Sequence, residues 1–151
     1  MNQCSKFNII AEKWINIANL NYGKANFGCC AINEYQIAVV GGEIHKEVFS
    51  DSIEVYNQQT KIWKVCNVKL PDSIRCASVI SVEKEKILVI GGESRTGALK
   101  SFVDIDLVKE HLAPLPNLEN PITNACSYYF NSNLYIMFGD NGEGNQVFFR
   151  S

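Results

Sequence analysis

Residues 37–42 read Ile-Ala-Val-Val-Gly-Gly, and residues 87–92 repeat the pattern 50 positions later as Ile-Leu-Val-Ile-Gly-Gly. A weaker copy, Tyr-Ile-Met-Phe-Gly-Asp, follows at 135–140 after a further 48 positions. A period of this size indicates one folding unit repeated along the chain. Continuous apolar runs that end in glycine are typical of strands covered on both faces, because glycine tolerates positive φ where the chain turns in a crowded place. The expected repeat glycines are Gly41, Gly42, Gly91, Gly92 and Gly139.

A second landmark keeps the same phase as the glycines. It is a pair of bulky residues with six residues between its members. The pairs are Phe7/Trp14, Tyr56/Trp63 and Ile105/Leu112, and they recur every 49 residues. An apolar residue follows each pair at Leu20, Leu70 and Leu118. We expect Trp14 and Trp63 each to fill the gap between neighbouring units, because a large aromatic side chain gains most where it is covered.

The two landmarks together resemble the kelch repeat, in which each repeat forms one four-stranded blade of a β-propeller. The resemblance covers essentially the whole chain and implies an all-β, partial kelch-type propeller built from four-stranded antiparallel blades. It divides the chain into a half blade at 1–22, complete repeats at 23–70 and 71–118, and a partial repeat at 119–151. The second unit lacks both aromatic residues, and the third has Gly139-Asp140 in place of Gly-Gly.

The remaining strands are predicted from weaker apolar alternation, at 52–56, 77–82, 101–105 and 125–129, with a further third strand at 146–149. The total is about three blades, whereas closed propellers have four or more. The chain is therefore expected to be a piece of a longer propeller, one half of a self-paired ring of six blades, or an open arc. Open blade edges also make self-association a possibility.

Composition narrows the function classes. Hydrophobic residues make up 46% and charged residues 20% of the sequence, and the net charge is −2. This balance gives no electrostatic support for a nucleic-acid partner. No apolar stretch is long enough to cross a membrane as a helix, and the segment 1–20 lacks the pattern of a secretory signal. We therefore expect no membrane partner and a cytoplasmic protein.

The six cysteines predict neither a metal site nor disulfides. Cys29, Cys76 and Cys126 each lie a similar distance before the first glycine of a strand-end motif, so we expect them at equivalent positions as small buried apolar residues. No Cys-x2-Cys pair or partnered histidine is present, and disulfides are unusual in the cytosol. One exposed thiol could instead sense redox state. We expect no metal or cofactor.

Catalysis has little support in this sequence. His45 and His111 are the only histidines, and no nucleophile elbow, zinc-binding helix motif or phosphate loop is present. Residues 91–97 contain glycines and a hydroxyl group but lack the lysine of a phosphate loop. We therefore predict that the chain is not an enzyme. The alternative is a fragment of an enzymatic propeller, of the oxidase or sugar-isomerase type, whose catalytic residues lie on other blades.

Binding is the remaining class of function. If the first strand of each blade is innermost, the connections at 43–51, 93–100, 71–75, 113–124 and 140–145 emerge on one face. Loops on a rigid scaffold commonly carry recognition, and in kelch proteins such faces usually bind protein segments. We predict a protein–protein interaction module or scaffold, with a cytoskeletal, actin-associated scaffold as a further alternative. The candidate contacts are His45, Lys46, Glu47, Arg75, Arg95, Lys100, Asp140 and Glu143.

Overall fold

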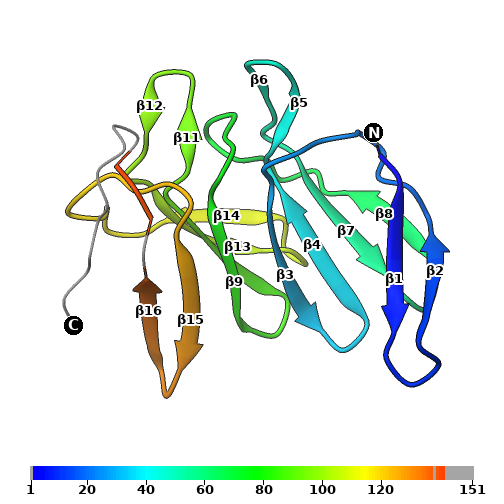
Figure 1. Cartoon of the computed structure of the whole chain (residues 1–151). Helices are drawn as coiled ribbons and strands as arrows, with labels where there is room; N and C mark the ends of the chain where they lie inside the picture. Colours follow the sequence, from blue (N-terminus) through cyan, green and yellow to red (C-terminus); the bar gives the residue numbers. More distant parts are fainter. Residues whose placement is uncertain (1, 138, 142–151) are drawn as a thin grey trace.

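The structure is a computed structural model, and it describes residues 2–137 and 139–141 (Figure 1). Within these residues the regular secondary structure consists of strands alone. The strands are β1 (Cys4–Asn8), β2 (Lys13–Ile17), β3 (Gly28–Asn33), β4 (Gln36–Val40), β5 (Glu43–His45), β6 (Val48–Phe49), β7 (Ile53–Asn57), β8 (Ile62–Val65), β9 (Ser78–Glu83), β10 (Lys86–Ile90), β11 (Glu93–Ser94), β12 (Gly97–Ala98), β13 (Phe102–Asp106), β14 (His111–Pro114), β15 (Cys126–Phe130) and β16 (Asn133–Met137). The strand predicted at 146–149 and the candidate Glu143 lie outside these residues.

Two four-stranded antiparallel sheets form the centre of the molecule, with the strand orders β3-β4-β7-β8 and β14-β13-β10-β9. The hairpins β1-β2 and β15-β16 form two-stranded sheets on either side (Figure 1). The expectation of an all-β chain with four-stranded antiparallel sheets is thus confirmed. The four strands predicted from alternation each begin one residue earlier than β7, β9, β13 and β15 do. The connections at 43–51 and 93–100 were expected as loops, but they fold into the small hairpins β5-β6 and β11-β12.

Neighbouring sheets meet along their first strands, because β9 contacts both β3 and β15. Main-chain bonds join the residues that precede these strands: Cys76 N–H donates to Asn26 O at 2.7 Å, and Asn124 N–H donates to Cys76 O at 3.0 Å. A Cβ on Gly28 would overlap Val79 Cγ2 on the next sheet. Glycine at this position therefore allows the two sheets to approach closely.

The main core lies between the two four-stranded sheets. Its most deeply buried members are β-branched residues of the central strands, including Ile53, Ile87 and Ile105, all at 0% exposure. A second, smaller cluster joins β1-β2 to the adjacent sheet and contains Leu20, Val39, Tyr56 and Trp63. Burial on both sheet faces explains why the β4 and β10 sequences are continuous apolar runs.

The two tryptophans differ sharply in burial. Trp63 is 7% exposed and its Nε1–H donates to Ala18 O at 2.8 Å, so it fills the gap between sheets as expected. Trp14 stacks on Phe7 with ring centroids 5.3 Å apart but is 72% exposed. The expectation that Trp14 also fills such a gap was wrong for the described residues, because no described sheet packs on its outer side.

The first hairpin of the third repeat is one residue shorter than the corresponding hairpins of the first two repeats. The hairpins β3-β4 and β9-β10 each contain a register shift, whereas β15-β16 pairs without one. The bridge between Thr123 and Asp140 corresponds to the bridge between Arg75 and Glu93. Gly139 therefore matches Gly92, the second glycine of its pair, and the alignment of Gly139-Asp140 with Gly-Gly was wrong by one residue.

The three cysteines that were expected at equivalent positions are not equivalent. Cys126 begins β15 in the way that Gly28 begins β3. Cys29 is the second residue of β3, and Cys76 precedes β9 with a φ of 56°. The three cysteines therefore occupy three different positions of the repeat. Cys29 and Cys126 are exposed, so the expectation of equivalent buried residues was wrong.

Within the described residues, no helix is long and apolar enough to cross a membrane.

Candidate functional site

The hairpins β5-β6 and β11-β12 project from the same end of the two central sheets (Figure 1). Each hairpin begins directly after a Gly-Gly pair. Gly42 N–H donates to Ile74 O at 2.8 Å, and Gly92 N–H donates to Ile122 O at 2.8 Å, so each pair is bonded to the segment that leads into the next sheet. The positive φ values of 102° at Gly42 and 96° at Gly92 permit this turn. The repeated motif therefore fixes where each hairpin starts.

Arg75 connects the two hairpins. Its Nη1 donates to Glu43 Oε2 and its Nε donates to Glu93 Oε2, each at 2.9 Å. The guanidinium carbon also lies 4.8 Å from the ring centroid of Phe49 on β6. Arg75 and Glu93 exchange main-chain hydrogen bonds of 2.9 and 2.8 Å. One side chain thus holds two sheets' hairpins in a fixed relation, which a planar guanidinium with several donors does better than an ammonium.

The electrostatics favour the ionised forms of Glu43 and Arg75. The pKa of Glu43 is lowered, first by the Glu47 main-chain N–H and then by the Arg75 guanidinium. The pKa of Arg75 is raised by its bonds to Glu93 and Glu43. The Arg75 side chain is only 28% exposed, so its pairing is partly shielded from solvent. The cluster suits a structural connection better than proton transfer near neutral pH.

The other predicted site residues are distributed over the hairpins and the loops beside them. His45, Lys46 and Glu47 are exposed at the tip of β5-β6. Arg95 is exposed on the second hairpin, and its Nε donates to Glu47 O at 3.1 Å, so these two tips are brought together.

Two further predicted residues lie away from that contact. Lys100 Nζ donates to Glu119 O at 2.7 Å, beside the loop before β15. Asp140 pairs with Thr123 in the third repeat, and its Oδ2 accepts from Asn124 Nδ2 at 3.3 Å. His111 is exposed at the start of β14, beyond the turn that follows β13. Among the described residues of the predicted set, the hydrogen bond from Arg95 to Glu47 O is the contact that joins two hairpin tips.

Sequence reasoning identified Arg75 but missed its partners Glu43, Glu93 and Phe49. A signal for two of them was present, since Glu43 and Glu93 each follow a Gly-Gly pair and so occupy the same place in their repeats. A cation between two like charges at the same repeat position is favourable, and Arg75 lies in the segment that leads into β9. Phe49 carried no such signal.

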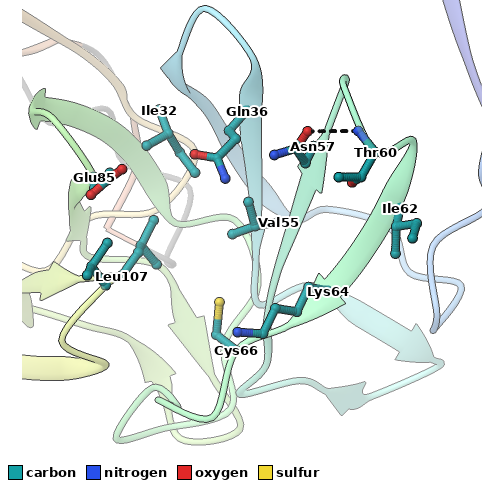
Figure 2. A pocket seen from close by; sticks show the side chains of 11 residues that line it. Ile32, Gln36, Val55, Asn57, Thr60, Ile62, Lys64, Cys66, Glu85 and Leu107 are labelled. Atoms are coloured by element: carbon teal, nitrogen blue, oxygen red, sulfur yellow. Dashed lines mark hydrogen bonds between the residues drawn. The ribbon is translucent and has the colours of Figure 1, made fainter.

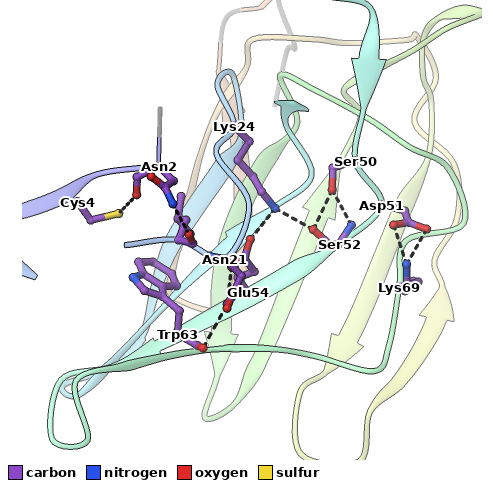
Figure 3. Close-up of polar contacts among 11 residues, drawn as sticks. Asn2, Cys4, Asn21, Lys24, Ser50, Asp51, Ser52, Glu54, Trp63 and Lys69 are labelled. Atoms are coloured by element: carbon purple, nitrogen blue, oxygen red, sulfur yellow. Dashed lines mark hydrogen bonds and ion pairs between the residues drawn. The ribbon is translucent and has the colours of Figure 1, made fainter. Parts of the chain in front are cut away.

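A buried ion pair lies beneath the segment that enters β3 (Figure 3). Lys24 Nζ is 3.0 Å from Glu54 Oε1, and both side chains are fully buried. Lys24 also donates to Ser52 Oγ at 2.8 Å, while Glu54 Oε2 accepts from Asn21 N and Nδ2 at 2.9 and 3.0 Å. This network joins the connection after β2 to β7. Sequence reasoning missed it because two opposite charges far apart in the sequence form no motif.

A cavity of about 420 Å³ lies at the other end of the central sheets (Figure 2). Its lining includes Gln36, at the end of β4 opposite to the hairpin β5-β6. Across residues 2–137 and 139–141, no group of three or more His, Cys, Asp or Glu side chains is arranged to hold a metal ion.

No protein-family model matches this chain, and no curated protein matches it either.

Proposed function

We propose that this chain is part of a kelch-type β-propeller and acts as a protein–protein interaction module or scaffold. Three observations support the propeller. The two central sheets share one strand order, their first strands lie next to each other, and the same glycine turn links each sheet to the next. Radial repetition of four-stranded antiparallel sheets has these features.

The proposed binding surface is the hairpin face, which we define as the two hairpins at 43–49 and 93–98 together with Arg75. The observation that carries the proposal is the pair of hydrogen bonds from Arg75 to Glu43 and Glu93, because together with the Arg95–Glu47 bond they hold two hairpins in one arrangement. Preorganised loops lose less conformational entropy when a partner binds. The arrangement leaves His45, Lys46 and Arg95 exposed at the tips.

The exposed tips favour a partner segment with at least one carboxylate. Lys46 and Arg95 are both cationic, and the Arg95 guanidinium has donors beyond the one directed at Glu47 O. The carboxylates of Glu43 and Glu93 are already bound to Arg75. An extended acidic peptide would therefore meet the exposed cations Lys46 and Arg95 at the tips, beside the exposed Glu47 carboxylate, with the paired carboxylates of Glu43 and Glu93 between the hairpins.

Selection of a random peptide library displayed on phage against the purified chain tests this proposal. We expect enriched peptides to contain acidic residues, and we expect the double variant Lys46→Ala/Arg95→Ala to bind them at least about ten-fold more weakly, since each lost charge-assisted bond is worth about 1.5 kcal/mol or more. The matched control is Lys13→Ala/Lys84→Ala, which removes two exposed lysines away from the hairpin face. Peptides that bind the two double variants equally, or no enrichment at all, would contradict the proposal.

A further inference from the structure

The cavity of about 420 Å³ lies between the sheet β3-β4-β7-β8 and the turns of the next sheet. Ile32, Val55, Cys66 and Leu107 form its apolar interior, and all four belong to or pack on the main core cluster. Polar groups are present at its rim, from Gln36, Asn57, Thr60, Lys64 and Glu85 (Figure 2). An apolar interior with a few polar groups at this volume is typical of a small-molecule site.

The gap between the two central sheets contains a smaller side chain than the preceding gap at one equivalent position. In the preceding gap between sheets, Trp63 spans the distance and its indole Nε1 bonds to Ala18 O. The register places Leu112 opposite Ile105 just as Trp63 is opposite Tyr56. Leu112 is therefore the equivalent of Trp63 in the second gap, and an aliphatic side chain has replaced an indole. Leu112 packs on the main core cluster and does not line the cavity, and neither that cluster nor the cavity lining contains a described aromatic residue.

Lys64 lies at the rim of the cavity, and its neighbour Glu110 lies outside the cavity lining. Glu110 accepts from Asn67 Nδ2 at 2.6 Å, and this bond is the main cause that lowers its pKa. Lys64 Nζ is 4.0 Å from Glu110 Oε1 and makes no hydrogen bond within the described residues, and its side chain is 77% exposed. In Figure 2 the Lys64 ammonium points toward Cys66, while Glu85 lies on the opposite side of the space. An anion in the cavity would therefore be drawn to the Lys64 side and repelled from the Glu85 side.

We propose that this cavity is a binding site for a small organic acid that consists of an aromatic ring and a carboxylate. The ring occupies the apolar interior between Val55 and Leu107, where the cavity lining contains no aromatic residue. The carboxylate accepts a charge-assisted hydrogen bond from Lys64 at the rim. This site is at the end of the sheets opposite to the hairpin face and does not depend on the function proposed for that face.

Titration of the full chain with indole-3-propionate, followed by isothermal calorimetry and by NMR of the Val and Leu methyl groups, tests the proposal. We expect saturable binding with a Kd on the order of 0.1–1 mM, as befits a ligand of this size. The neutral probe indole is expected to bind about two- to five-fold more weakly, because an exposed ion pair contributes modestly. The largest methyl shifts are expected at Val55 and Leu107.

Two variants test separately the apolar interior of the cavity and the role of Lys64 at its rim. Val55→Phe places a ring of the chain's own in the cavity and should abolish binding of both probes, and its melting temperature shows whether the fold is kept. Lys64→Met should remove the preference for indole-3-propionate over indole, while Lys13→Met, an exposed lysine on β2, should leave it unchanged. The proposal is overturned if neither probe shows saturable binding at probe concentrations up to ten times a Kd of about 1 mM. It is also overturned if a folded Val55→Phe variant binds the probes as the wild type does.

Discussion

Trp63 and Tyr56 are cross-strand partners on β8 and β7, and their ring centroids lie 5.2 Å apart. The six residues between them in sequence are the turn and the strand ends that bring them together. Both are buried against Leu20 and Val39, so this pair connects β1-β2 to the first central sheet. The spacing of the two aromatic residues in the sequence therefore follows from the register between the third and fourth strands of the sheet.

Replacement of Trp63 tests the importance of that contact. Trp63→Ala should lower the free energy of unfolding by about 3–5 kcal/mol, because it removes a buried ring and leaves a cavity. Trp14→Ala is the matched control, and it should cost less than about 1 kcal/mol since Trp14 is largely exposed. Urea denaturation followed by circular dichroism measures both values. Equal losses for the two variants would show that the burial of Trp63 is not what stabilises this gap.

The buried Lys24–Glu54 pair should be sensitive to removal of either partner. Glu54→Ala should destabilise the chain by about 3–5 kcal/mol, because it leaves the Lys24 ammonium buried without its counter-charge. The exposed pair Lys69–Asp51 is the control, and Asp51→Ala should cost less than about 1 kcal/mol. The double variant Lys24→Met/Glu54→Leu should regain most of the loss in the same urea denaturation. A double variant as unstable as Glu54→Ala would contradict this account.

Arg75 should control the order of the hairpin face. Arg75→Lys keeps the charge but cannot bond to Glu43 and Glu93 in the same fork geometry. We expect hydrogen–deuterium exchange at the amides of 43–49 and 93–98 to become at least several-fold faster, with little change in β9 and β10. Unchanged exchange in both hairpins would mean that the hairpins are ordered without Arg75.

Acidification should loosen the same surface. The folded pKa of Glu43 lies below its ordinary value, so the carboxylate stabilises the fold above pH 4.5 and this contribution is lost as the pH falls below that value. Wild-type chain should therefore show faster exchange in the 43–49 hairpin between pH 5 and 3, after correction for the intrinsic rate. Glu43→Gln should show this faster exchange already at pH 7 and a weaker dependence on pH. A wild type and variant with the same pH profile would exclude Glu43 as the group responsible.

The cysteines should differ in reactivity. Burial raises the pKa of Cys30 to about 12 and raises that of Cys66 as well, so both remain thiols at pH 8. Cys29 and Cys126 are exposed, and we expect a disulfide-exchange reagent to modify them first. Mass spectrometry of the modified peptides over time measures the order. Modification of Cys66 as fast as Cys29 would contradict the burial described here.

The sequence predicted the repeat and the central strands well because these features depend on local pattern. The apolar runs before Gly41 and Gly91 are buried central strands, and the Tyr56–Trp63 spacing is a hairpin. The phase of the third unit could not be predicted, because the register shift that the first two hairpins contain has no sequence marker and is missing in β15-β16. The missing shift explains only part of the misplacement of the cysteines, because Cys29, Cys76 and Cys126 also lie at unequal distances from their glycines.

Features that depend on pairing between distant segments were harder to predict. Arg75 was identified as a candidate, but its bonds to Glu43 and Glu93 require knowledge of which hairpins lie side by side. The exposure of Trp14 depends on what packs outside β2, and sequence spacing contains no such information. The replacement of an indole by Leu112 was visible in the sequence as a missing aromatic residue, whereas the cavity beside Val55, which Leu112 does not line, was not visible there.

The central claim is that the hairpin face binds a protein segment, and hydrogen–deuterium exchange of the chain with a peptide selected from the displayed library tests it most directly. The account predicts slower exchange at 43–49 and 93–98 in the bound state, and predicts that Lys46→Ala/Arg95→Ala abolishes this protection. Protection confined to the turns around Thr60 and Leu107, at the opposite end of the sheets, would contradict it.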